Sequence, residues 1–127
     1  AFEIARNGSL SQRRTYAALG GGAVPDGICL DAEGAVWLAS PTTREFIRVR
    51  EGGEVTRRIP AGEPEVTRRI SAGEVTGERM AIACMLGGPD RRTLYLVSAV
   101  TMPWATPQIR DSRIDQLRVD VPGAGLP

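Results

Sequence analysis

The sequence predicts an all-β fold, because it contains one clear hairpin and a series of short apolar runs beside Gly-containing turns. Residues 28–30 and 35–39 are apolar, and the polar turn 31–34 between them ends in Gly, which tolerates positive φ. Both runs are apolar along most of their length rather than alternating. We therefore expect this hairpin to lie deep in the fold, with both faces covered.

Further strands are expected on both sides of this hairpin. At the N-terminus, Asn7-Gly8 is a strong signal for a tight turn between two strands. Two runs after the hairpin complete one four-stranded sheet, and three later runs supply strands of a second sheet. Outside the hairpin, the expected strands are 1–5, 14–19, 45–50, 54–59, 81–86, 93–99 and 113–121.

Length and composition indicate a single globular domain, 1–127. The chain has 16 basic and 15 acidic residues, so it lacks the charge footprint of a protein that binds nucleic acid or an anionic membrane. No apolar run approaches the ~18 to 20 residues of a membrane span, and the N-terminus does not resemble a signal peptide. We therefore expect a soluble, cytoplasmic protein. Histidine is absent, which excludes Ser-His triads and His-rich zinc sites.

The two cysteines, Cys29 and Cys84, each lie in an apolar run that is expected to form a strand. Cysteine behaves as a small hydrophobic residue in protein cores, so two buried free thiols are the first interpretation. A disulfide is the alternative, because the two strands could be neighbours. The sequence supplies neither the distance nor the side-chain directions that a disulfide requires.

A ten-residue segment is duplicated. Residues 54–63 recur as residues 65–74, and the copies differ only where Ser71 replaces Pro60. A four-stranded sheet needs one such strand. The surplus copy is therefore expected to bulge out as a loop, to add a further strand, or to pair with another chain, and its charges suit an exposed edge strand.

Asp26 is the strongest candidate for a site residue. It lies between Pro25, which restricts the preceding backbone, and Gly27, which allows a sharp turn into the first hairpin strand. A carboxylate fixed at the start of a strand can bind a cation. Asp31 and Glu33 could be a catalytic carboxylate pair, but their place in the turn favours a structural role.

The segment 100–111 is long for a loop in a compact domain. It could be a lid over a site or only a connector, and the sequence favours neither. Trp104 lies among the prolines of this segment, and it is the better of the two tryptophans for contacting a substrate or partner.

Several motifs, taken in order, resemble those of one known family. Residues 25–34 and 36–39 are similar to the signature hairpin of the senescence marker protein / gluconolactonase / regucalcin family, and 84–90, 93–96 and 119–127 supply further matches. Members of that family are six-bladed β-propellers with one divalent metal ion in the central channel. The resemblance covers the C-terminal part of the family fold, so it implies a partial β-propeller of about two and a half four-stranded antiparallel blades.

The resemblance also implies a function. Asp26 matches the family aspartate that is both a metal ligand and the base that activates water, so the implied activity is metal-dependent hydrolysis of a lactone or ester, with Ca²⁺, Zn²⁺ or Mn²⁺. The other family ligands would lie before Ala1. Two alternatives therefore stay open: a non-catalytic half-propeller that acts as an oligomerising or binding module, and a truncated remnant of a full enzyme. Because an open fragment exposes sheet edges, we expect a homodimer or a higher assembly.

Overall fold

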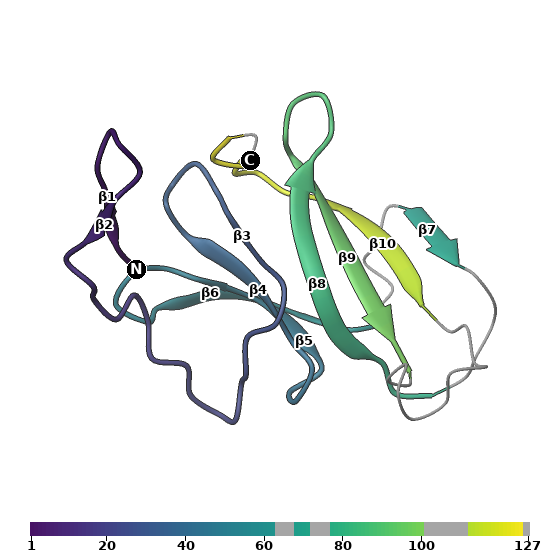
Figure 1. Ribbon diagram of the computed structural model, residues 1–127. Helices are drawn as coiled ribbons and strands as arrows, with labels where there is room; N and C mark the ends of the chain where they lie inside the picture. Colours follow the sequence, from purple (N-terminus) through teal and green to yellow (C-terminus); the bar gives the residue numbers. More distant parts are fainter. Residues whose placement is uncertain (63–67, 72–76, 101–111, 126–127) are drawn as a thin grey trace.

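The computed structural model describes residues 1–62, 68–71, 77–100 and 112–125. In this part of the chain all regular structure is β, and it forms two four-stranded antiparallel sheets and one small hairpin (Figure 1). The predicted all-β fold class is confirmed. We call the two sheets the first blade and the second blade.

The first blade contains β3 (Ile28–Leu30), β4 (Val36–Ser40), β5 (Glu45–Val49) and β6 (Val55–Pro60) in chain order. Tight turns join successive strands, and Gly34 takes a φ of 77° in the turn between β3 and β4. Only glycine enters that region freely, so the expected hairpin and its turn are both confirmed.

The second blade has the strand order β7-β10-β9-β8. Three of its strands form a meander, β8 (Met80–Gly87), β9 (Thr93–Ala99) and β10 (Arg113–Arg118). The fourth strand is β7 (Arg68–Ser71), which comes before the meander in the chain and pairs with the outer edge of β10. The second copy of the duplicated segment thus supplies the outer strand that the second blade otherwise lacks.

The N-terminal residues form a separate hairpin, β1 (Glu3–Ile4) and β2 (Leu10–Ser11), with Gly8 in its turn. The prediction that residues 14–19 form the second strand of this hairpin was wrong, because these residues form no strand. They instead run irregularly across the first blade, where Tyr16 and its apolar neighbours pack against β4 and β5. Side-chain burial places this segment without a strand ladder.

The main core lies between the two blades, which face each other. Large apolar side chains of β4 and β5 meet side chains from all three meander strands of the second blade. On β9 the burial alternates, so that Leu94 and Leu96 point into this core while Tyr95 is half-buried on the opposite face. The buried core residues are Trp37, Ala39, Phe46, Ile59, Ala81, Cys84, Leu86, Leu94, Leu96, Leu117 and Val119.

The predicted depth of the 28–39 hairpin was right for one strand and wrong for the other. β4 is buried along most of its length, whereas Ile28 and Leu30 on β3 are 57% and 49% exposed. β3 is the edge strand of the first blade, and only its middle residue, Cys29, packs against the core. An apolar run predicts burial only where a neighbouring element covers it.

Candidate functional site

Asp26 lies at the contact between the two blades. Its backbone N–H donates to the carbonyl of Ala39 at 2.9 Å, and the N–H of Gly27 donates to the carbonyl of Ile82 at 3.0 Å. A side chain at Gly27 would place its Cβ 2.6 Å from the Cα of Ala83. Only glycine permits this approach, so the backbone that carries Asp26 is fixed to both blades.

The Asp26 side chain is exposed, and the described residues include no group of three or more His, Cys, Asp or Glu that could hold a metal ion. A hard cation such as Ca²⁺ takes six to eight oxygen ligands. The described residues therefore do not form a metal site by themselves. Asp26 can supply one carboxylate to a site that other groups would have to complete.

Asp31 has a structural role in the turn between β3 and β4. It is buried, and its Oδ1 accepts the N–H groups of Glu33 and Ala35, each at 3.0 Å. Its Oδ2 accepts a hydrogen bond from Nε of Arg48 at 2.7 Å. This agrees with the expected turn role, and it adds a buried ion pair that links the turn to β5.

Glu33 binds the same arginine, through Nη2 of Arg48 at 2.8 Å. The hydrogen bond from Arg48 lowers the pKa of the Glu33 carboxyl. The Glu33 carboxylate is therefore not poised as an acid, and one guanidinium pairs with both carboxylates. The role of Arg48 was not predicted from the sequence, because an arginine in an apolar run gives no sign that it will be buried against Asp31.

The C-terminal segment closes one end of the junction between the blades. The N–H of Ala124 donates to the carbonyl of Leu30 at 3.1 Å, and the N–H of Gly123 donates to the carbonyl of Arg91 at 2.9 Å. The N–H of Ala32 donates in turn to the carbonyl of Pro122 at 2.8 Å. This segment therefore ties the β3–β4 turn to the second blade.

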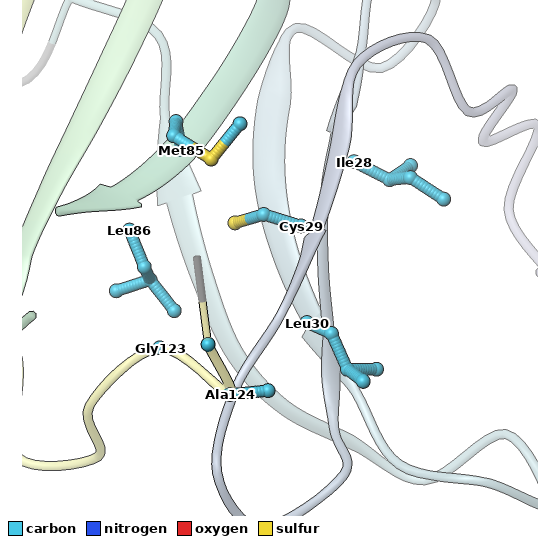
Figure 2. A pocket seen from close by; sticks show the side chains of 8 residues that line it. Ile28, Cys29, Leu30, Met85, Leu86, Gly123 and Ala124 are labelled. Carbon is cyan, nitrogen blue, oxygen red and sulfur yellow. The ribbon is translucent and has the colours of Figure 1, made fainter. Parts of the chain in front are cut away.

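A cavity of about 430 Å³ lies beside this segment, between β3 and β8 (Figure 2). Figure 2 shows the sulfur of Cys29 turned toward β8, near Met85 and Leu86. The lining is apolar side chain and backbone, without a carboxylate or guanidinium. The lining residues are Ile28, Cys29, Leu30, Met85, Leu86, Gly123, Ala124 and Gly125. Asp26 is not among them, so the cavity and the candidate carboxylate are separate features.

Cys29 and Cys84 face each other across the junction of the blades, and both are free thiols. Cys84 is buried, as first interpreted, whereas Cys29 is only partly buried. The Cys84 thiol donates to the carbonyl of Gly27 at 3.7 Å. A hydrogen bond from the same thiol to the Cys29 thiolate lowers the pKa of Cys29. The same contact, together with burial, raises the pKa of Cys84. Cys29 is the less buried of the two and borders the cavity, so it is the thiol that ionises first. The sequence placed both cysteines in strands but could not show that they meet.

Trp104, the predicted contact for a substrate, lies outside the described residues, as does most of the 100–111 segment. Its role stays a prediction. Within the described chain, no helix is long and apolar enough to cross a membrane.

Two consecutive four-stranded antiparallel sheets, packed face to face, define the fold as part of a β-propeller. A solved structure of a luciferin-regenerating enzyme has the same fold, with a TM-score of 0.65 and 17% identity over 96% of this chain and 38% of that enzyme.

The family follows from sequence comparison. Residues 1–100 match the family model described as the SMP-30/Gluconolactonase/LRE-like region, and the chain belongs to this family. Regucalcin from Danio rerio is 34% identical over 95 residues, and regucalcin from Xenopus laevis is 33% identical over 95 residues. Each match covers 74% of this chain. The chain spans 28% and 27% of the length of these two relatives. The resemblance predicted from the motifs is confirmed.

Proposed function

We propose that this chain carries part of the active site of a metal-dependent hydrolase of the gluconolactonase type, which opens a lactone or related ester. Membership of the family supports the reaction class, and the position of Asp26 supports its role. The single observation that carries the proposal is the backbone around Asp26, which is hydrogen-bonded to both blades and leaves the carboxylate exposed.

In this proposal Asp26 is a ligand of a divalent ion, Ca²⁺, Zn²⁺ or Mn²⁺, and it takes the proton of the attacking water. The bound ion supplies polarisation of the ester carbonyl. The remaining ligands come from outside the described residues, from the rest of this chain, from a longer form of this polypeptide or from a second chain. Trp104 is proposed to contact the substrate. A cytoplasmic location stays a prediction.

The test is an assay of glucono-δ-lactone hydrolysis in which proton release is measured, with Ca²⁺, Zn²⁺ and Mn²⁺ added separately. We expect Asp26→Asn to lower the metal-dependent rate about 100-fold or more, because a positioned general base contributes about that much. Asp120→Asn is the matched control, since Asp120 is also an exposed aspartate. Equal rates in the two variants would remove Asp26 from the mechanism.

A second candidate function is a non-catalytic binding or oligomerising module. It is favoured by exposed apolar side chains on β3 and β8, where Ile28 and Met85 are 57% and 50% exposed. Such surfaces are typical of interfaces. This candidate predicts no lactone hydrolysis with any of the three metals and a homodimer or larger assembly in sedimentation. A stable monomer at micromolar concentration would count against it.

A further inference from the structure

The duplicated segment occupies two equivalent places in the fold. Its first copy provides β6, the outer strand of the first blade, and its second copy provides β7, the outer strand of the second blade. The first residue of β5, Glu45, pairs with Pro60, and the first residue of β10, Arg113, pairs with Ser71. Positions 60 and 71 are equivalent in the duplication, so both copies pair in the same register.

Among the described residues, β7 has the shortest ladder in its sheet. It pairs with β10 through four residue pairs, whereas β9 pairs with β10 through six. If β7 leaves, residues 113–116 lose their partners on that side and the edge of β10 offers free backbone N–H and C=O groups. Within the described part of the sheet, the outer strand therefore has fewer ladder pairs to lose on opening than any other strand.

The chain can also be continuous without β7. Removing residues 64–74 would join Glu63 to Val75, which reproduces the existing sequence Glu74-Val75. Residues 61–63 and 75–79 would then link β6 to β8, and eight residues span up to roughly 27 Å when extended. The outer strand of the first blade, β6, would still lead directly to β8, the edge strand of the second blade on the side opposite β7. β7 is thus a separable strand that the remaining topology does not require.

We propose that the outer edge of β10 is a strand-binding site for the duplicated sequence, and that a second copy of this chain can fill it in place of the chain's own β7. The identical pairing of the two copies carries this inference, because it shows that one sequence fits the outer position of two different blades. The same strand pair forms within a chain or between chains, so protein concentration and the linkers decide which form prevails. Reciprocal exchange gives a closed twofold dimer.

The binding site is tested with a fluorescent peptide of residues 65–74 and the variant that lacks residues 64–74. Anisotropy is expected to show saturable binding to the deletion variant. The unaltered chain should bind the peptide at least about tenfold more weakly, because its own β7 competes at a high effective concentration. The control peptide carries Ile70→Pro, which removes a backbone N–H and interrupts the ladder.

Equal binding of both peptides would overturn the proposal, and so would the absence of saturable binding to a folded variant. If the deletion variant does not fold, the full-length Ile70→Pro variant takes its place, since its own strand cannot pair normally while the edge of β10 is unchanged. Circular dichroism shows which variant is folded, and the binding assay uses that variant.

The second copy as partner is tested by refolding the full chain from urea at low and at high concentration, followed by sedimentation. We expect a larger dimer fraction after refolding at high concentration, and its loss in the full-length Ile70→Pro variant. A dimer that Ile70→Pro leaves unchanged, or a monomer at both concentrations, would rule out exchange of this strand. Neither result depends on lactone hydrolysis, so this inference and the proposed function can fail separately.

Discussion

The two blades have the same architecture, but their chains reach it in different ways. The first blade is a simple meander whose four strands follow one another in the sequence. In this blade a buried ion pair between Asp31 and Arg48 links the β3–β4 turn to β5. The second blade is a meander of three strands, and its outer strand, β7, is taken from the chain that precedes it. In this blade Arg79 is buried and binds Ser98 on the neighbouring strand, and the largely buried Arg113–Asp115 ion pair lies within β10 rather than joining a turn to a strand.

This difference shows which part of a blade local sequence controls. Short turns join β3 to β4 and β8 to β9, so the turn itself determines which strands pair. In the first blade a short turn also joins β5 to β6, but the outer position of the second blade has no such constraint, because β7 lies before the meander in the chain. It accepts any segment with a suitable pattern that can reach it, and in this chain the duplication provides a second such segment.

The largest effect is expected from breaking the fastening of the first blade. Asp31→Ala removes the acceptor of two backbone N–H groups and leaves Arg48 without its buried partner. Loss of one member of a buried ion pair costs about 3–5 kcal/mol, so the free energy of unfolding in urea should fall by about that amount. Asp31→Asn, which keeps one acceptor oxygen, should fall between this variant and the unaltered protein.

The control for this prediction is Glu33→Ala. Glu33 also binds Arg48 but is half exposed, so its removal should change stability little. If Asp31→Ala and Glu33→Ala lower stability equally, the buried pair does not fasten the blade as described.

A smaller effect is expected at the contact between the two blades. Gly27→Ala would bring a methyl group to 2.6 Å from the backbone of Ala83, so the innermost strands must move apart. Overpacking of this kind costs about 1–3 kcal/mol, measurable as a lower urea midpoint. Gly20→Ala is the matched control, because a Cβ at Gly20 meets nothing within 4 Å. Equal midpoints for both variants would contradict the close approach.

The smallest effect concerns the thiols at the same contact and leaves stability aside. Because the Cys84 thiol can donate a hydrogen bond to the Cys29 thiolate, the pKa of Cys29 is lowered, and Cys29 forms thiolate at a lower pH than an ordinary cysteine. Alkylation by iodoacetamide, followed by mass spectrometry, should therefore modify Cys29 before Cys84, and its rate should rise at a lower pH than in an unfolded peptide.

Cys84→Ala tests the cause of that shift. Without the donor the pKa of Cys29 rises, so its alkylation at neutral pH should slow, while the rate at high pH changes less. Faster modification of Cys84 in the unaltered protein would contradict the assigned direction of the two shifts.

The candidate site shows the limit of prediction from this sequence. Pro25 and Gly27 flank Asp26, and they predicted a carboxylate held firmly at the start of a strand. What they could not supply is the second blade that holds it, since the N–H of Gly27 is bonded to Ile82, more than fifty residues away. The meeting of Cys29 and Cys84 and the burial of Arg48 are long-range contacts of the same kind.

The sequence by itself determined most of the strands and turns, because alternation, apolar runs and glycines in turns act over a few residues. It also determined the family, through motifs that keep their order along the chain. Tertiary structure alone decided the place of the second repeat, the irregular path of residues 14–19 and the exposure of β3. The reason is that burial and edge pairing depend on which surface is available when the blades pack, and two copies that differ at one position, 54–63 and 65–74, do not by themselves encode which blade each will join.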